Sequence, residues 1–282
     1  SMALLNSLYN LNKNRKIDCK IVVAHINHGI RKEADEETEF VQKFCENREI
    51  PCYIKKEKVE ELAKKQKIGT EEAGRKLRYS FFEEVLEKTK ASKIATAHNA
   101  NDNAETVLMN IIRGSGTAGL KGIEIKRDNK YIRPLIKCER NEIEEYCSKE
   151  QLDPRQDKTN KENIYTRNKI RNELIPFIQE KFNPNIIVTL NRLSELAYNE
   201  NEYIQNQTKM EYNKNMEKFA VRLKELRTEK GLSIQGLSKA TKIGVASICR
   251  WENQQADVKG TQLVILAKFF DVTIDYLMGL ED

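Results

Sequence analysis

Strand-like and helix-like segments alternate along the first half of this 282-residue chain. The predicted strands are short and apolar and cover residues 20–26, 51–54, 93–98 and 131–135. The predicted helices have apolar residues at helical spacing and cover residues 33–47, 70–88 and 101–112. Such alternation implies βαβ units and a parallel sheet. We therefore expect an α/β domain with a parallel, Rossmann-like sheet, followed from residue 139 by a mostly helical region.

The corner between strand 93–98 and helix 101–112 concentrates chemically useful side chains. His98 ends the strand, and Asp102 and Glu105 lie three residues apart on one helical face. Ligands of open α/β sheets bind outside the carboxyl ends of the strands. The corner therefore predicts a ligand site, and the alternative is a helix cap with solvated acidic side chains.

Two further groups of cationic residues suit a phosphate or a nucleotide. His25 and His28 follow the first strand, and the alternative for them is an exposed polar turn. Arg75 and Arg78, three residues apart in helix 70–88, share a face, and guanidinium groups bind phosphate oxygens in pairs. The alternative for this pair is an ordinary charged helix with internal ion pairs.

The segment from residue 113 to 122 is a glycine-dense turn. It begins with Arg113, Gly114 and Gly116, and glycine lets backbone amides approach an anion closely. It matches neither a Walker loop nor a Rossmann fingerprint, and a plain surface loop is the alternative. Further along, Arg167 and Arg171 lie four residues apart near a helix start, which suits phosphate or RNA-backbone contact, and a solvated basic face is the equal alternative.

Composition limits the classes of protein to which the chain belongs. The formal net charge of +6 suits a polyanionic partner, since a basic protein is attracted electrostatically to nucleic acid. The six cysteines form no CxxC pair and have no histidine at zinc-ligand spacing, which indicates free thiols in a reducing compartment. No apolar run is long enough to span a membrane. We therefore expect a cytoplasmic protein without a metal site of its own.

Six motifs then occur in a fixed order along the chain. They are His25-x-Asn-His28-Gly-x-Arg31, Glu71-Glu-Ala-Gly-Arg-x-x-Arg78-Tyr-x-Phe-Phe82, Ala97-His98 with Asp102-x-Ala-Glu105-Thr106, Arg113-Gly-Ser-Gly-x-x-Gly119-Leu-x-Gly122-Ile123, Arg133-Pro-Leu135 and Arg167-Asn-x-Ile-Arg171. This ordered set resembles the N-terminal catalytic domain of the tRNA(Ile)-lysidine synthases, a family of the PP-loop ATP pyrophosphatase superfamily. The resemblance covers about residues 1–205.

The resemblance implies a two-step reaction on RNA. The family adenylates the 2-carbonyl oxygen of the wobble cytidine in the isoleucine tRNA with a CAU anticodon, and the amine of free lysine then displaces AMP. By resemblance, Asp102 and Glu105 hold lysine, and His98 stands beside the activated base. Arg78 and Arg171 stabilise phosphate charge or place the anticodon loop.

The same resemblance, added to the motifs, implies two further sets of site residues. The ATP-binding set is Ser1, His25, His28, Arg113, Gly114 and Gly116. The tRNA-binding set is Arg75, Arg133 and Arg167. ATP is the expected cofactor, and Mg²⁺ is expected with its pyrophosphate rather than from any ligand motif.

The chain also departs from the family pattern. The phosphate loop Ser-Gly-Gly-x-Asp-Ser is absent, only its last residue matching Ser1, and the central strand ahead of it is absent as well. Asn101 stands where many relatives have aspartate. We expect from this a synthase domain truncated at its N-terminus that binds tRNA weakly and lacks catalysis. An artefactual joining of two genes is a further alternative, motivated by the start at Ser1 and an internal Met216.

Residues 216–282 resemble a different family, the Cro-type helix-turn-helix repressors. The matching pattern is Leu223-Lys-Glu-Leu-Arg227, Gly231-Leu-Ser233, Leu237-Ser-Lys239, Ile243, Ile248-x-Arg250-Trp251-Glu252-Asn253 and Phe270-x-Val-x-x-Asp275-Tyr276-Leu277. About five short helices are expected. The resemblance places a recognition helix over about residues 244–253, whose DNA-binding side chains are Val245, Ser247, Arg250 and Asn253.

The alternative for this segment is a helical packing module without DNA binding. Trp251, Leu237 and Ile248 are core residues by their spacing under either interpretation.

The predicted organisation has four parts. These are a nucleotide-binding α/β domain over residues 1–138, a helical region of the synthase over 139–205, a linker or fraying helix end over 206–215 and the helix-turn-helix domain over 216–282. Two functions remain open: a tRNA-modifying ligase disabled by truncation, and a DNA-binding regulator with an inert or sensory N-terminal half. A homodimer is compatible with either function.

Overall fold

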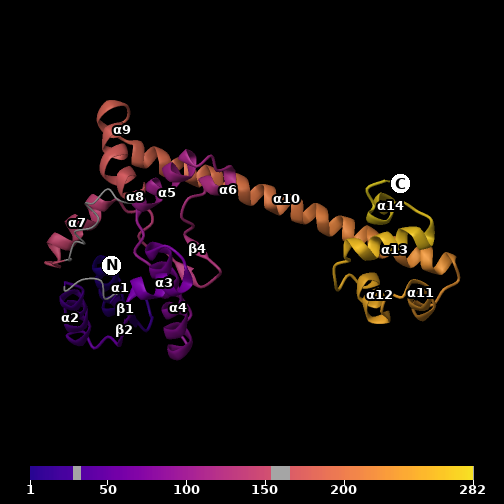
Figure 1. Cartoon of the computed structure of the whole chain (residues 1–282), viewed down its shortest axis with the longest axis horizontal. Coiled ribbons are helices and arrows are strands. Elements are labelled where there is room, and N and C mark those ends of the chain that lie inside the picture. Colours follow the sequence, from indigo (N-terminus) through magenta and orange to yellow (C-terminus); the bar gives the residue numbers. More distant parts are fainter. Residues whose placement is uncertain (28–32, 154–165, 282) are drawn as a thin grey trace. The chain divides into compact units, whose positions relative to one another are not determined.

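The computed structural model describes residues 1–27, 33–153 and 166–281 and divides into two compact units, Ser1–Tyr198 and Asn199–Asp282. The elements of the first unit are labelled in Figure 1 and follow in chain order: α1 (Met2–Lys13), β1 (Val23–Asn27), α2 (Glu33–Glu46), β2 (Cys52–Lys56), α3 (Val59–Gln66), α4 (Thr70–Thr89), β3 (Ile94–Ala95), α5 (Ala100–Ile112), α6 (Thr117–Leu120), β4 (Lys126–Arg127), β5 (Tyr131–Ile132), α7 (Arg140–Lys149), α8 (Thr166–Lys169), the π-helix η2 (Ile170–Leu174), α9 (Ile175–Lys181) and the start of α10 (Ile186–Glu229). The mixed α/β architecture expected from the alternating pattern is confirmed.

The described strands form two small sheets. β1 pairs with β2 in parallel, from Val23 opposite Cys52 to Asn27 opposite Lys56. β5 lies between β3, to which it is parallel, and β4, to which it is antiparallel. The pattern predicts one parallel sheet, and the described residues instead contain two. No described strand joins β1 to β3, and β3 is only two residues long because the chain leaves the sheet to cap α5.

The helices that the apolar spacing predicts are confirmed as α2, α4 and α5, each within one residue of the expected limits. A capping box fixes the start of α5: the Asn99 side chain accepts from the Asp102 amide at 2.9 Å, and the Asp102 carboxylate accepts from the Asn99 amide at 3.0 Å. The cap directs α5 out of the β3 strand end. Asp102 is thereby held at the corner that the sequence singles out.

The core of the first unit that bears on function surrounds α5. Its buried members come from α5, η2, α9 and α10 and are Ala104, Val107, Ile170, Ile175, Ile187 and Leu190. Burying aliphatic side chains stabilises a fold by about 1.5–3 kcal/mol each. This packing brings the Arg167–Arg171 segment, far away in sequence, against the N-terminal half of α5.

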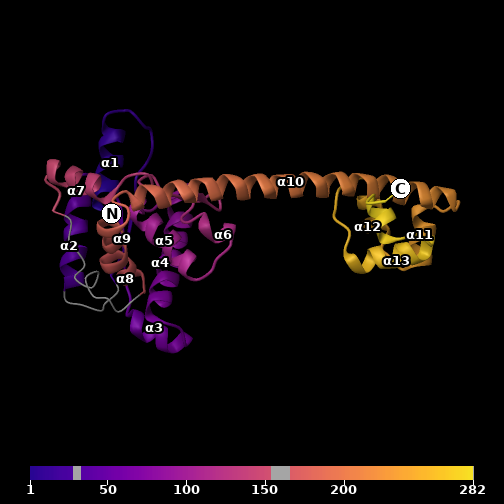
Figure 2. The same ribbon diagram turned by 90° about the horizontal axis from the view of Figure 1, so that it is seen from above.

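The second unit is entirely helical among its described residues. α11 (Ile234–Thr241), α12 (Val245–Glu252), α13 (Gly260–Phe270) and α14 (Ile274–Met278) gather around the last turns of α10, as both Figure 1 and Figure 2 show. Their shared core consists of Phe219, Leu223, Leu237, Ile243, Ile248, Trp251, Leu266, Ala267, Phe270 and Leu277. Four short helices and the end of the long helix α10 stand where about five short helices were expected, and the core positions of Leu237, Ile248 and Trp251 are confirmed.

The segment over residues 206–215 is helical and forms part of α10. Residues 206–214 are exposed, so this stretch is helical without burial, and it continues the turns on either side because extending an existing helix adds one hydrogen bond per residue without a new nucleation cost. Among the described residues, no helix is both long and apolar enough to cross a bilayer.

Candidate active site

The N-terminal half of α5 carries a buried carboxylate surrounded by arginines. The side chain of Glu105 is 1% exposed, although a lone buried carboxylate is very unfavourable. Arg171 neutralises the charge of this carboxylate. Arg171 Nε donates to Glu105 Oε1 at 2.6 Å, and Arg171 Nη2 donates to Glu105 Oε2 at 2.8 Å. Two parallel bonds of this kind fix both the distance and the orientation of the pair.

Two more arginines complete what we call the acid–arginine cluster: Asp102, Glu105, Arg140, Arg167 and Arg171. Arg167 Nε donates to Glu105 Oε2 at 3.0 Å, and Arg140 Nη2 lies 3.4 Å from Oε1 of the same carboxylate. Asp102 accepts from Arg171 Nη2 at 3.2 Å. The cluster contains three guanidinium groups and two carboxylates, so its positive charge exceeds its negative charge.

The ion pairs set the protonation of the cluster. Burial raises the pKa of Glu105, but the hydrogen bonds and charges of Arg171 and Arg167 outweigh burial and hold that pKa below its ordinary value. Burial lowers the pKa of Arg171, and its bond to Glu105 raises that pKa above the ordinary range. Both groups are therefore charged at neutral pH.

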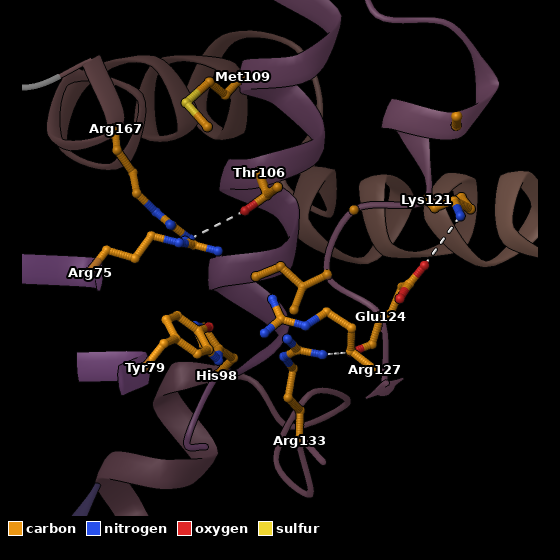
Figure 3. Close-up of a pocket in the computed structure, with 13 residues that line it drawn as sticks. Arg75, Tyr79, His98, Thr106, Met109, Lys121, Glu124, Arg127, Arg133 and Arg167 are labelled. Atoms are coloured by element: carbon orange, nitrogen blue, oxygen red, sulfur yellow. Dashed lines mark hydrogen bonds and ion pairs between the residues drawn. The ribbon is translucent and has the colours of Figure 1, made fainter. Parts of the chain in front are cut away.

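A pocket of about 340 Å³, the arginine pocket, opens next to this cluster (Figure 3). The residues lining it come from α4, the segment between β3 and α5, α5, α6 and the loop after it, β4, the residue after β5, and α8: Arg75, Tyr79, His98, Thr106, Met109, Ala118, Lys121, Gly122, Ile123, Glu124, Arg127, Arg133 and Arg167. Arg167 belongs to both the pocket and the cluster, since its Nη2 also donates to the Asp102 carbonyl at 3.0 Å. The pocket and the cluster thus form one continuous site.

His98 is the titratable base of the arginine pocket. Its Nδ1 pairs with the Thr96 hydroxyl at 2.9 Å, while its Nε2 has no partner among the described residues. Burial lowers the pKa of His98, the charge of Asp102 opposes that shift, and the charges of Arg133 and Arg167 add to it. The imidazole is therefore neutral at pH 7 and able to accept a proton.

A buried amide network fixes the glycine-rich loop that closes the pocket. Asn103 accepts from the Ile123 amide at 2.6 Å and donates to Asn191 of α10 at 2.9 Å. Ser194 of α10 donates to the Lys121 carbonyl at 2.6 Å. Gly122 has φ of +63°, and a Cβ at this position would lie 2.2 Å from Asn103 Oδ1. Only glycine fits this turn without displacing the network.

The end of β1 holds a separate polar cluster. His25 Nε2 lies 3.2 Å from the Thr38 hydroxyl, and burial lowers the pKa of His25. Asn27, 2% exposed, donates to Asp35 at 2.7 Å and to Thr38 at 3.2 Å. His25 does not line the arginine pocket. His28, the other histidine expected to bind ATP, lies outside the described residues.

The second unit presents its α12 helix with a mixture of exposed and engaged side chains. Val245 and Arg250 are exposed and Ser247 is half-buried. The Asn253 amide donates to the Cys249 carbonyl at 2.8 Å, so it caps the end of its own helix. Contact of Val245, Ser247, Arg250 and Asn253 with DNA stays a prediction.

Two protein-family models match parts of this chain. The family model described as PP-loop domain matches residues 1–178, and the model described as helix-turn-helix matches residues 223–277. The chain belongs to the PP-loop domain family. Its second unit matches the helix-turn-helix family over a shorter part of the sequence.

Curated relatives of this PP-loop protein share its first three quarters. It is 52% identical over 213 residues to the tRNA(Ile)-lysidine synthase of Clostridium acetobutylicum, covering 75% of this chain and 46% of that protein. It is 48% identical over 205 residues to the synthase of Clostridium tetani, covering 72% and 44%. For the synthase of Geobacillus kaustophilus the identity is 35% over 222 residues, covering 77% and 47%. The chain spans about half the length of these relatives.

A solved structure of similar fold is the U34-tRNA thiolase NcsA from Methanococcus maripaludis with its [4Fe-4S] cluster. The TM-score is 0.54 at 20% identity, with 68% of each chain covered. At this identity the likeness concerns the fold alone.

The PP-loop unit brings together some of the residues singled out in its sequence and separates others. Those in the cluster or the pocket are His98, Asp102, Glu105, Arg171, Arg75, Arg133 and Arg167. Arg78 is exposed on α4 and does not line the pocket, and Ser1 is exposed before α1. Arg113 lies eleven residues beyond Asp102, about 16 Å along the α5 axis. Gly114 and Gly116 follow it outside the pocket.

Several site residues of the PP-loop unit were not singled out in the sequence. Arg127 and Lys121 line the pocket, and Arg140 completes the cluster. Asn103 and Asn191 position the loop. Lys121 lies within a quoted motif, but Arg127 and Arg140 lie in no recognisable pattern, and only their spatial convergence identifies them.

Proposed function

We propose that this chain contains the catalytic site for the ATP-dependent ligation of lysine to the wobble cytidine of an isoleucine tRNA with a CAU anticodon. The observation that supports this most is the identity of 52% over 213 residues with a tRNA(Ile)-lysidine synthase. That span includes both the acid–arginine cluster and the arginine pocket. A cytoplasmic location is part of the proposal, because the proposed substrates are tRNA, free lysine and ATP.

The proposed reaction has two balanced steps. The 2-carbonyl oxygen of the cytidine attacks the α-phosphorus of ATP, and pyrophosphate leaves. The amine of lysine then attacks C2, and AMP leaves with the oxygen. Both steps concentrate negative charge on phosphates, which preorganised cations stabilise. The arginine-rich site supports chemistry of this kind.

The two carboxylates are suited to different parts of this reaction. Glu105 is fully buried and holds Arg171 and Arg167, so we assign it the positioning of these arginines. Asp102 is 18% exposed and has fewer bonds to arginine, so it is the carboxylate that we expect to meet the lysine ammonium. Neutral His98, with its Nε2 without a described partner, is suited to take the proton that lysine must lose before it attacks.

Magnesium stays an expectation from the chemistry of ATP. Within the described ranges, no three His, Cys, Asp or Glu side chains converge as a metal site. Glu105 is enclosed by Arg167 and Arg171, so its carboxylate does not fit a metal ion. The roles assigned above are those of the chain's own side chains.

The test is incorporation of labelled lysine into unmodified isoleucine tRNA with ATP and magnesium. The chain is assayed as given and with a Ser-Gly-Gly-x-Asp loop and its strand joined ahead of Ser1. Asp102→Asn is expected to lower incorporation at least tenfold, whereas Asp18→Asn, an exposed substitution outside the site, leaves it unchanged. Absence of incorporation in both chains would refute the proposal.

A second candidate function belongs to the helix-turn-helix unit. We propose that it binds duplex DNA through α12, supported by the family match over residues 223–277 and by the exposure of Val245 and Arg250. The test measures binding of the full chain to random-sequence duplexes and selects preferred sites. Arg250→Gln is expected to weaken binding to the selected DNA site by about 1–3 kcal/mol. Equal affinity for all sequences and for single strands would contradict sequence-specific binding.

A further inference from the structure

The described lining of the arginine pocket contains more basic than acidic side chains. Its basic lining residues are Arg75, Lys121, Arg127, Arg133 and Arg167. Glu124 is the only acidic residue among those lining it, and its carboxylate already lies 3.2 Å from Lys121 Nζ. Figure 3 shows the guanidinium groups of Arg75 and Arg167 pointing toward one another, and those of Arg127 and Arg133 converging likewise.

Arg127 is held in place by aromatic rings. Its guanidinium lies 4.9 Å from the Tyr79 ring centroid and 4.5 Å from that of Tyr131. Tyr131 is 3% exposed, and its hydroxyl donates to Glu83 at 2.7 Å, which fixes the ring. Such cation–π contacts orient a guanidinium without neutralising its charge. Arg127 is therefore preorganised, and its one carboxylate partner, Asp128, is itself exposed.

Arg133 is a buried cation without a described carboxylate partner. The residue is 5% exposed, one of its Nη groups donates to the Glu124 carbonyl, and its buried Nε has no hydrogen-bond partner in the described structure. A buried charge that is not paired costs several kcal/mol. Arg75 also forms no ion pair among the described residues and lies over Tyr79 instead. Both arginines indicate that an anion completes the pocket.

We propose that the arginine pocket binds a phosphate group, with Arg127 and Arg75 as its main ligands and Arg133 as the buried cation behind them. Guanidinium groups bind phosphate oxygens in pairs, and several guanidiniums converge here from different elements. The pocket volume of about 340 Å³ lies within the range of small-ligand sites. The phosphate comes from the RNA strand beside the target base or from the nucleotide.

This inference rests on the proposed function only for the choice of RNA. The arginine pocket belongs to the site proposed for lysine ligation, but phosphate binding to the pocket is measured without lysine and without turnover. A chain that binds phosphate through these arginines and yet makes no lysine adduct would refute the proposed function alone. The two failures are therefore distinguishable.

The experiment measures affinities of the full chain for two probes by fluorescence anisotropy. The probes are a stem-loop RNA with the CAU anticodon loop of isoleucine tRNA and a fluorescent ATP without magnesium. The variants are Arg127→Gln and Arg75→Gln, and the matched control is Arg192→Gln, which removes an exposed arginine of α10 outside the pocket. Arg75 is exposed, so its variant retains the fold even where Arg127→Gln does not.

Both pocket variants are expected to lower the affinity for one of the two probes about tenfold. The control is expected to leave the affinity for both probes unchanged. If the RNA is affected, the slope of log affinity against log salt falls by about one for each lost phosphate contact, which assigns the phosphate to the strand. If ATP is affected instead, the phosphate is that of the nucleotide. Unchanged affinity of Arg75→Gln and of a folded Arg127→Gln for both probes would overturn the proposal.

Discussion

Arg171 and Glu105 form a two-point ion pair that joins η2 to α5, with donor–acceptor distances of 2.6 and 2.8 Å. The two residues lie 66 positions apart in the sequence. The carboxylate is 1% exposed, and the arginine side chain is 19% exposed. The pair therefore fixes the geometry of the candidate site and also contributes to the stability of the first unit.

Removal of the buried carboxylate should destabilise the first unit. Glu105→Ala leaves Arg171 and Arg167 without their main partner, and breaking such a pair costs about 3 kcal/mol. The measurement is the urea midpoint of the transition followed by far-UV circular dichroism. The control Glu39→Ala removes an exposed ion pair with Lys43 and should change stability by less than about 0.5 kcal/mol. Equal effects of the two substitutions would contradict the cluster's structural role.

The same ion pair predicts how stability depends on pH. The pKa of Glu105 is lower in the folded chain than its ordinary value of about 4.3. As pH falls, the unfolded chain therefore binds the proton before the folded chain does. The stabilisation is fully present above that ordinary value and is lost as pH falls through the lower folded pKa. The urea midpoint should fall more steeply below pH 4.5 than that of Glu105→Gln, and parallel pH profiles would count against the ion pair.

Two glycine substitutions separate backbone strain from steric clash in the loop. Gly114 has φ of +72° and open space at its Cβ position, so Gly114→Ala should cost about 1 kcal/mol. Gly122 has φ of +63°, and its added Cβ would meet Asn103, so Gly122→Ala should cost about 2–4 kcal/mol and weaken RNA binding. Thermal unfolding and RNA anisotropy check both effects. Equal costs would mean that the loop does not depend on the Asn103 network.

The second unit contains a comparable buried clamp. Arg227 Nε and Nη2 donate to Glu252 at 2.6 and 2.8 Å, with side chains 10% and 6% exposed. Glu252→Gln should destabilise this unit by about 3 kcal/mol, and combining Glu252→Leu with Arg227→Met should recover part of the loss. Trp251 is the only tryptophan, so its fluorescence reports this unit alone. A double variant less stable than Glu252→Gln would contradict the prediction.

The spacing of apolar residues in the sequence predicted the helices of the first unit well. The sequence predicted the residues of the candidate site only in part. Apolar spacing identified α2, α4 and α5, because each buries one face. The corner at Asp102 and Glu105 was predicted because both residues share a short motif. Their partner Arg140 was not, because an isolated arginine gives no pattern until the fold brings it to α5. For residues 206–215 the sequence left a linker and a fraying helix end open, since polar composition is shared by linkers and exposed helices, and the stretch is helical.

The arginine pocket illustrates the same limit. Arg75, Arg133 and Arg167 were predicted as a tRNA-binding set only through the family resemblance, and for Arg75 and Arg167 the residues alone left a plain charged helix surface as the alternative. Their convergence depends on α5 packing against η2 and on the β4–β5 hairpin that carries Arg127, and neither relationship has a sequence pattern. Long-range packing therefore decides which charged residues form a site.

The most direct test of the central claim is mass spectrometry of nucleosides from the isoleucine tRNA with a CAU anticodon after incubation with ATP, lysine and the chain that carries the added Ser-Gly-Gly-x-Asp loop and strand. The account predicts a cytidine heavier by one lysine residue at the wobble position. It predicts no such product with methionine tRNA or with Asp102→Asn. Unmodified cytidine in the isoleucine tRNA, despite measured binding of both RNA and ATP, would contradict the assignment of lysine ligation to this site.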